Sequence, residues 1–411
     1  MQVRSDLASV LLLIGIASVA CQPSPPPSDD AGNGDASETS GSSPAETGES
    51  GEEEVPGQTT SSSTGSTGGT STSTSSTSSD GSDASTTSPG TTTTVEETTG
   101  GADETGSDAE GALAMRTQCP EAPPAGPIAD PVQDVYNLTV PRETYVPLFQ
   151  QMEPFQGSRG TLPWHIYEPE QASANPDDRF PLLVVLHGGR GRELADGNLS
   201  VDVLPYLVGS SNGLLTDAHR QQYPVYILAP HCIEDEGCVF GTNEWASVGG
   251  AFYQVQPEPS VAGGTALELI EHVAETYAVD RTRIYVTGNS MGGGGTWEFV
   301  QRRPDLFAAG VTVSGHVPSL SDLDVLAASK VPVWAFTGAD DNVNSDEDTD
   351  QAVAHLTSQG GCAWITKYAN TGHVDVLWAN PYLDAGLWPW LFAQKIPTVG
   401  EPGAGDPFPT E

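Results

Sequence analysis

Hydrophobic and polar positions divide the chain into two unlike parts, with the boundary near residue 117. Residues 22–117 consist mainly of Ser, Thr, Gly, Pro and acidic residues, with almost no large apolar side chain. Such a segment cannot bury enough apolar surface to offset its conformational entropy, so we expect a disordered linker over residues 21–117. Residues 118–411 instead alternate short apolar runs with helical patterns, which predicts one large folded domain.

The apolar runs of this domain have the length of buried strands, and helical patterns separate them. This alternation is typical of an α/β protein, with a mainly parallel sheet flanked by helices on both faces. The expected strands are residues 164–167, 182–186, 225–229, 284–287, 310–313, 331–336 and 363–368. The expected helices are residues 266–277, 346–358 and 383–394.

One of these strands runs into a glycine-rich turn that contains a serine. Residues 284–295 read IYVTGNSMGGGG, with the pattern G-x-S-x-G over Gly288 to Gly292, and a helical pattern follows until Pro304. A strand, a sharp turn and a helix in this order form a nucleophile elbow, which exposes the serine hydroxyl above the sheet. We therefore expect Ser290 to be a nucleophile. The alternative is a glycine-rich loop that only turns the chain.

An acid and a histidine follow Ser290, in the order that α/β-hydrolases use. The strand over 331–336 leads to TGADDNV, where the G-x-x-D spacing from Gly338 selects Asp341 over Asp340. The next strand leads to His373 in a loop. We expect His373 to be the general base and Asp341 to orient it.

Two further groups of residues are expected around the serine. Gly189, in the segment LHGG after the strand over 182–186, and Met291 are expected to donate their backbone N–H groups to an oxyanion. Trp245, Phe252 and Tyr253 lie in the long segment after Pro230 and are expected to form a substrate rim.

We expect no metal and no organic cofactor. The run from Asp340 to Asp346 imitates the start of a calcium loop, but Ser345 and Gln351 stand where that loop requires glycine and a bidentate acid. His231, Cys232 and Cys238 lack a second pair of ligands at the spacing of a zinc site.

The first twenty residues predict export. Arg4, an apolar stretch over residues 7–19 and small residues before Cys21 form a secretory signal that is too short to span a membrane. Residues 18–21, SVAC, resemble a bacterial lipobox, which predicts a lipid anchor at Cys21 as the contact with the membrane. The same residues also fit ordinary signal peptidase, which would release a secreted protein.

The other four cysteines predict disulfides, because an exported chain with an even number of cysteines usually pairs them. Three connectivities are possible. We favour Cys232 with Cys238, which closes a short loop, and Cys119 with Cys362, which would fasten the end of the linker to the domain.

The negative charge of the domain limits the kinds of partner that we expect it to bind. Residues 118–411 hold 37 acidic and 13 basic residues, a formal charge of −24, so nucleic acid is excluded as an expected partner. We expect a monomer that acts on an ester, either a small molecule or a side group of a polymer.

From about residue 162 to 394 the chain resembles bacterial α/β-hydrolases known as predicted peptidases or carboxylesterases, relatives of the polyhydroxybutyrate-depolymerase and feruloyl-esterase group. The segments that carry the resemblance, in order, are LPWHIYEPE, FPLLVVLHGGRG, YILAPHC, RIYVTGNSMGGGGTWEFVQRRPDLFAAGVTVSG, VPVWAFTGADDNV and NTGHVDVLWANPYL. The resemblance implies catalytic Ser290, Asp341 and His373, with an esterase better supported than a peptidase. The chain departs from the family at Thr337, where histidine is frequent, and at residues 374–376, where serine and tryptophan usually follow the histidine.

These observations predict an exported serine hydrolase that cleaves carboxylic esters through a Ser-His-Asp triad and an acyl-enzyme intermediate. The alternatives are a serine peptidase that acts on small peptides and a non-catalytic surface binding module on a hydrolase scaffold. The intact set of serine, acid and histidine favours an enzyme.

Overall fold

The computed structural model describes residues 111–124, 126, 128–138, 140–189, 199, 204–232, 245–246 and 252–409. The expected signal segment, Cys21, nearly all of the expected linker and Cys238 lie outside these residues. In the described part of the chain, no helix combines the length and the apolar composition that crossing a membrane requires.

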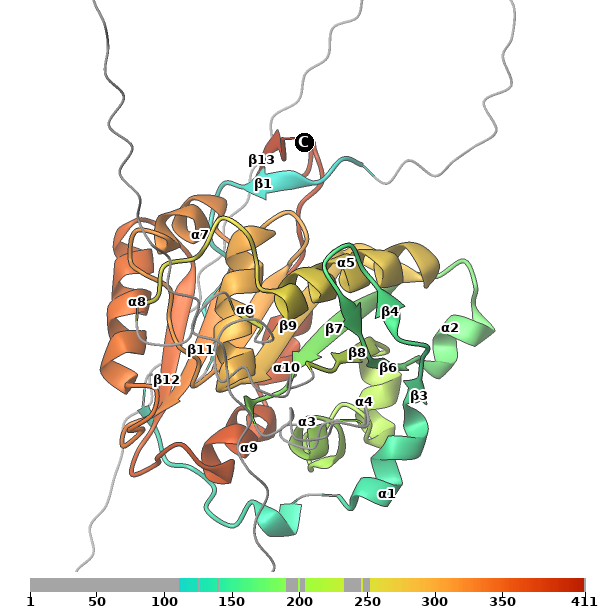
Figure 1. Cartoon of the computed structure of the whole chain (residues 1–411), viewed down its shortest axis with the longest axis horizontal. Helices are drawn as coiled ribbons and strands as arrows, with labels where there is room; N and C mark the ends of the chain where they lie inside the picture. Colours follow the sequence, from blue (N-terminus) through green and yellow to red (C-terminus); the bar gives the residue numbers. More distant parts are fainter. Residues whose placement is uncertain are drawn as a thin grey trace, which may run out of the picture. The chain divides into compact units, whose positions relative to one another are not determined.

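A sheet of nine strands forms the centre of the described residues (Figure 1). Its order is β2 (Ile128–Ala129), β12 (Ala363–Tyr368), β11 (Val333–Gly338), β10 (Ala309–Val313), β9 (Val279–Asn289), β7 (Phe180–Leu186), β8 (Tyr226–Pro230), β6 (Trp164–Tyr167) and β3 (Gln150–Gln151). The pairs of β6 with β8 and of β3 with β6 are antiparallel, while the other neighbours are parallel. The predicted fold class, an α/β protein with a mainly parallel sheet, is confirmed.

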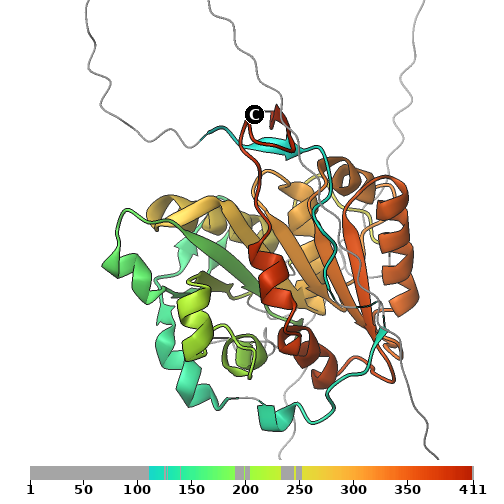
Figure 2. The ribbon, with the colours of Figure 1, turned by 180° about the vertical axis from the view of Figure 1, so that it is seen from behind.

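Helices cover both faces of this sheet. The helices α5 (Val261–Thr276), α6 (Met291–Arg302), α7 (Leu323–Ser329) and α8 (Asp346–Ser358) lie on one face (Figure 1). The helices α3 (Leu204–Gly209), α4 (Asp217–Gln222), α9 (Asp375–Leu383) and α10 (Leu387–Phe392) lie on the other (Figure 2). The remaining elements are β1 (Ala114–Arg116), α1 (Arg142–Tyr145), β4 (Phe155–Gln156), β5 (Thr161–Leu162), α2 (Glu170–Ala174), β13 (Ala404–Pro407) and the short 3-10 helices Tyr136–Leu138 and Val146–Leu148.

The alternation of side chains along the strands creates a separate core on each face. Leu182, Val184 and Leu186 of β7 join the cluster under α5 and α6, whereas Leu183 and Val185 join the cluster under α3, α9 and α10. All five are buried. A strand that is apolar on both faces reads as a continuous hydrophobic run, which is why FPLLVVL predicted a buried parallel strand.

Most of the expected strands and helices are present, but the bounds predicted for the last helix were wrong. β6, β12 and α8 have the predicted bounds, but the helix expected over residues 383–394 is the shorter α10, and α9 precedes it as a separate helix. The chain turns between them because Asp384 is extended, and its Oδ1 accepts a hydrogen bond from the Gly386 amide at 2.8 Å. A Cβ at Gly386 would overlap the Pro124 ring, so this turn requires glycine.

The described fold begins within the segment that we had assigned to the linker. Ala114 and Arg116 of β1 are buried, and β1 pairs with β13 in an antiparallel ribbon. The Arg116 guanidinium donates to the Ala308 carbonyl at 2.8 Å. The boundary at residue 117 therefore fell too late, because three residues of moderate hydrophobicity gave no strand signal until their partner strand was known.

The structure contains the predicted disulfide between Cys119 and Cys362, which closes a loop of 243 residues. It joins the chain after β1 to the start of β12. Cys232 is buried, and its expected partner Cys238 lies outside the described residues, so that pairing stays a prediction.

Replacing both Cys119 and Cys362 by serine should lower the free energy of unfolding by about 2 to 4 kcal/mol, because a long loop is then free in the unfolded chain. Thermal unfolding followed by circular dichroism measures the loss. A reductant should lower the melting temperature of the wild type to that of the double variant and leave the variant unchanged. Equal melting temperatures without reductant would contradict this role.

Candidate active site

Ser290 occupies a strained turn between β9 and α6. Its backbone has φ 52° and ψ −115°, a region that residues other than glycine rarely adopt. Its amide donates to the Val313 carbonyl at 2.9 Å, and its carbonyl accepts from the Gly294 amide at 3.0 Å. A Cβ at Gly292 would overlap the Leu186 carbonyl, so glycine allows the start of α6 to approach the end of β7. This is the geometry of a nucleophile elbow.

The structure brings together the three residues that the sequence selected as nucleophile, base and acid. Ser290 Oγ lies 2.9 Å from His373 Nε2, and His373 Nδ1 lies 2.9 Å from Asp341 Oδ2. The Asp341 side chain is fully buried, whereas the His373 side chain is 15% exposed. Asp340 is exposed, and its backbone amide donates to the Thr371 carbonyl at 3.0 Å. Asp341 rather than Asp340 therefore faces the histidine.

Hydrogen-bond donors surround the Asp341 carboxylate. Its Oδ1 accepts from the Val343 and Asn344 amides, each at 2.9 Å, and its Oδ2 accepts from the Ser314 hydroxyl as well as facing His373. Burial acts to raise the pKa of Asp341, but the hydrogen bonds from His373, Ser314 and the two amides outweigh burial and hold the pKa below its ordinary value of 3.8. The carboxylate is therefore charged near neutral pH and faces the imidazole as an anion.

Gly189 and Met291, the expected oxyanion donors, flank Ser290. Met291 is the first residue of α6, where backbone N–H groups lack partners within the helix. Gly189 follows β7 and lines the cavity at Ser290. The loop that carries Gly189 is held by the buried His187, whose Nδ1 lies 2.8 Å from the Gly188 carbonyl.

The tautomer of His187 follows from its contacts. Its Nε2 accepts a hydrogen bond from the Cys232 amide at 3.0 Å, so the ring proton is on Nδ1 and is donated to Gly188. The ring also contacts those of His231 and Trp245, both with centroids at 5.1 Å. His187 is therefore a structural residue that fixes the loop beside the serine.

A cavity of about 190 Å³ opens at Ser290 and His373. Two of its lining residues, Asp375 and Trp378, come from α9 directly after His373. The Trp378 ring meets the His373 ring edge to face, with centroids at 4.5 Å. Asp375 Oδ2 accepts a hydrogen bond from the Tyr136 hydroxyl at 2.9 Å. The full lining is Gly188, Gly189, Asn289, Ser290, His373, Asp375 and Trp378.

The expected substrate rim of Trp245, Phe252 and Tyr253 does not line this cavity. Trp245 is fully buried, and its Nε1 donates to the His187 carbonyl at 2.9 Å. Tyr253 is also buried, and its hydroxyl donates to the Gly294 carbonyl at 3.4 Å. Phe252 is half-buried against the core. The Trp245 side chain packs on α6 at Gly295, where a larger residue would overlap it.

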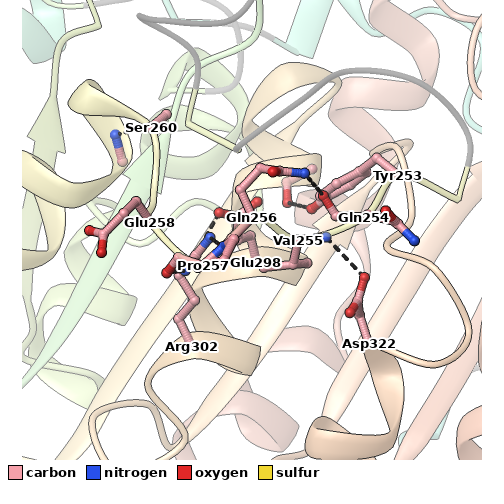
Figure 3. Close-up of polar contacts among 12 residues, drawn as sticks. Tyr253, Gln254, Val255, Gln256, Pro257, Glu258, Ser260, Glu298, Arg302 and Asp322 are labelled. Atoms are coloured by element: carbon pink, nitrogen blue, oxygen red, sulfur yellow. Dashed lines mark hydrogen bonds and ion pairs between the residues drawn. The ribbon is translucent and has the colours of Figure 1, made fainter. Parts of the chain in front are cut away.

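The segment that carries Tyr253 is fastened to α6 and to the start of α7 (Figure 3). Glu298 is buried and pairs with Arg302 at 2.7 Å, and the Arg302 guanidinium donates to the Gln256 carbonyl at 2.6 Å. The Val255 amide donates to Asp322 Oδ2 at 2.9 Å. These bonds join backbone groups to charged side chains, so the segment is held independently of any substrate.

Sequence reasoning missed Ser314, Asp375 and Trp378. Asp375 and Trp378 had a signal, since they lie two and five residues after the candidate base, within one helical turn of each other. Ser314 had none of comparable strength, because it follows the strand that lies between those of the nucleophile and the acid. Its place at the site depends on strand order.

No group of three or more His, Cys, Asp or Glu side chains is arranged to hold a metal ion in the described ranges. Asp346, the last acid of the calcium-like run, forms an ion pair with Lys367 at 2.8 Å. Asn344 donates through its side chain to the Ser314 carbonyl. Both side chains thus take part in structural contacts.

Comparison with known sequences finds similarity to hydrolases. The sequence pattern of the prolyl oligopeptidase family matches residues 266–355. A poly(3-hydroxybutyrate) depolymerase from Ralstonia pickettii is 29% identical over 195 residues, which cover 44% of this chain and 36% of the depolymerase. The chain thus spans about a third of the length of this relative.

Solved structures are similar in fold. A thermostable esterase superposes with a TM-score of 0.50 and 24% identity, over 61% of this chain and 64% of the esterase. The feruloyl esterase module from Clostridium thermocellum gives a TM-score of 0.44 and 15% identity, over 69% of this chain and 96% of the module. The likeness to the thermostable esterase, together with the mainly parallel sheet covered by helices on both faces, shows the α/β-hydrolase fold. The expected resemblance to the group of α/β-hydrolases that includes these esterases and peptidases is confirmed.

The lowered pKa of Asp341 predicts a pH-dependent contribution to stability. Because the carboxylate is more acidic folded than unfolded, it stabilises the fold above about pH 4, and this stabilisation is lost as the pH falls through the lowered pKa. Asp341→Asn should therefore reduce the free energy of unfolding by about 1 to 3 kcal/mol at pH 7 and by less at pH 3.

Urea unfolding of the wild type and of Asp341→Asn from pH 3 to 7 measures this difference. Asp340→Asn is the matched control, because Asp340 is exposed, and it should follow the wild type at every pH. A constant difference between the wild type and Asp341→Asn across the pH range would show that the carboxylate is not stabilised in its charged form.

Proposed function

We propose that this chain is a serine hydrolase that cleaves carboxylic esters, with Ser290 as nucleophile, His373 as general base and Asp341 as the acid that orients the base. One observation carries the proposal: an unbroken line of contacts from Ser290 Oγ through the two ring nitrogens of His373 to Asp341 Oδ2, with both distances at 2.9 Å. This arrangement, on a strained elbow beside a cavity, is suited to acyl transfer.

The contacts define a sequence of proton transfers. Asp341 accepts the Nδ1–H of His373, which leaves Nε2 free to accept the Ser290 proton as Oγ bonds to the ester carbonyl carbon. The protonated His373 then gives this proton to the leaving alcohol, and the acyl group stays on Ser290. Water attacks the acyl-enzyme with His373 again as base, which releases the acid and restores the serine.

The backbone amides of Gly189 and Met291 are proposed to bind the oxyanion of each tetrahedral intermediate. Gly189 lines the cavity, and Met291 follows the nucleophile at the start of α6, a helix of 12 residues whose dipole favours negative charge at this end. Each such donor contributes about 3 to 4 kcal/mol to transition-state stabilisation in other enzymes. This mechanism uses side chains and backbone amides alone. We also propose that the protein acts as a monomer.

An ester is preferred over a peptide as the substrate because the match to the depolymerase extends over 195 residues and the thermostable esterase superposes with a TM-score of 0.50. A serine peptidase is the second candidate. The prolyl oligopeptidase match favours it, but this match covers residues 266–355, which hold the elbow and the acid that both kinds of enzyme use. A non-catalytic binding module is disfavoured by the triad contacts.

Ser290→Ala should abolish hydrolysis and labelling by a fluorophosphonate probe, because it removes the hydroxyl proposed to form the acyl-enzyme. The expected fall in kcat is at least a thousandfold. The wild-type chain should hydrolyse nitrophenyl acetate and butyrate, and circular dichroism should show the variant folded. Ser321→Ala, an exposed serine outside the site, is the control and should keep full activity.

Substrate panels separate the candidates. Faster cleavage of feruloyl, acetyl and hydroxyacyl esters than of aminoacyl amides is the expected result for an esterase, and the reverse ranking would indicate a peptidase. A folded wild-type protein that neither reacts with the probe nor hydrolyses any ester or amide would reject both and leave the binding module.

We also propose that residues 1–20 direct export and that Cys21 carries a lipid anchor. The apolar stretch and the SVAC sequence support this proposal. The mature protein should then incorporate labelled fatty acid and partition into detergent, and Cys21→Ser should move it to the soluble fraction. A wild-type protein that is already soluble and unlabelled would favour ordinary secretion.

A further inference from the structure

Ser314 lies between the nucleophile and the acid, although it is not a member of the triad. It directly follows β10, which pairs in parallel with β9 on one side and with β11 on the other. Ser290 follows β9 and Asp341 lies beyond β11. Because parallel strands end at the same edge of a sheet, Ser314 is placed where one side chain can reach both neighbours.

The Ser314 side chain contacts the acid and the base together. Its Oγ donates to Asp341 Oδ2 and lies 3.0 Å from His373 Nδ1. The same Asp341 oxygen lies 2.9 Å from Nδ1. A hydroxyl has one hydrogen, and Asp341 receives it, so Ser314 Oγ acts as an acceptor toward His373. The Nδ1–H is therefore shared between the carboxylate and the hydroxyl.

The backbone of Ser314 is strained to place this hydroxyl. Its φ is 47°, in the left-handed region that favours glycine, and the side chain is buried. Its amide donates to the Phe336 carbonyl at 2.8 Å, and its carbonyl accepts from the Asn344 side chain, so neighbouring elements hold the conformation. Glycine would remove the strain but also the hydroxyl. A serine at such a position points to a role for Oγ.

We propose that Ser314 is a positioning residue that sets how strongly Asp341 holds the protonated form of His373. The inference rests on the proposed function, since it concerns the same proton transfers. By donating to Oδ2, the hydroxyl reduces the negative charge that Asp341 presents to the imidazole. By accepting from Nδ1–H, it fixes the ring plane. The first effect helps His373 to return its proton to the leaving alcohol, and the second keeps Nε2 directed at Ser290.

Other charged and titratable groups lie near Asp341 and His373. His316 follows Ser314 by two residues, and burial and the neighbouring His373 lower its pKa, while Asp341 and Asp348 of α8 act to raise it. Asp375 of α9 lines the same cavity as His373, and Asp340 precedes Asp341. A change at Ser314 leaves all of them in place, so a shift in the pH profile reports on the hydroxyl.

The test compares Ser314→Ala, Ser314→Gly and the control Ser329→Ala. The control removes another buried serine hydroxyl, which donates to the Leu326 carbonyl at the end of α7. Hydrolysis of nitrophenyl butyrate is measured from pH 5 to 9. Ser314→Ala should lower kcat about tenfold with KM within about twofold, and the acid limb of kcat/KM should move up by about 0.5 pH unit. The acid limb moves up rather than down because Asp341, without the hydroxyl, holds the protonated imidazole more strongly. The control should match the wild type.

Ser314→Gly separates the hydroxyl from the backbone strain. If the hydroxyl is responsible, the glycine variant shows the same upward shift as the alanine variant although its backbone is relaxed. A glycine variant with wild-type kcat and an unmoved acid limb would overturn the proposal, because strain would then explain the alanine result. A loss of activity that follows the unfolded fraction, with no change in the acid limb, would overturn it too.

A second measurement does not depend on turnover. In the Ser290→Ala protein at low pH, the proton on His373 Nδ1 should give a downfield NMR resonance. Adding Ser314→Ala should move this resonance further downfield, because the N–H is then bonded to Asp341 alone. An unmoved resonance would overturn the role of Ser314. A wild type that is inactive and unlabelled by fluorophosphonate would reject the proposed function instead, and the NMR result would still decide whether Ser314 acts on the pair.

Discussion

The site depends on the close backbone contact between the start of α6 and the ends of β7 and β10. Gly292 abuts the Leu186 carbonyl, and Gly293 abuts the Val313 carbonyl and Gly315. Any side chain at these two positions would push the helix away from the sheet. The contact holds Ser290 at a positive φ and aims its hydroxyl at His373, so the strain is maintained by packing on both sides.

The acid and base are held by a different means, a buried carboxylate with a full set of donors. Taking Asp341 out of water is costly, and the cost is offset because two backbone amides, one hydroxyl and one imidazole bind its two oxygens. The loop after β11 supplies the amides, and Ser314, directly after β10, supplies the hydroxyl. The direction of His373 therefore depends on residues that follow two neighbouring strands as well as on its own loop.

On the other side of the cavity, the residues that line it are held in place by buried residues behind them. Gly188 and Gly189 line the cavity with backbone. Behind them, His187 binds the Gly188 carbonyl and the Cys232 amide, and Trp245 donates to the His187 carbonyl. Trp245, which we expected in a substrate rim, is thus a packing residue. The rings of His373 and Trp378 lie at the cavity instead.

The sequence alone determined the strands, the elbow and the order of serine, acid and histidine, because these features are local: apolar runs, glycine spacing and one loop after each strand. It also indicated Asp341 through a four-residue pattern. It did not determine which segments meet in space. Ser314 reached the triad because β10 lies between β9 and β11, Trp245 entered the core because α6 carries glycines opposite it, and β1 became a strand because β13 returns beside it. Such contacts depend on strand order and helix packing, which residues distant in the chain decide together.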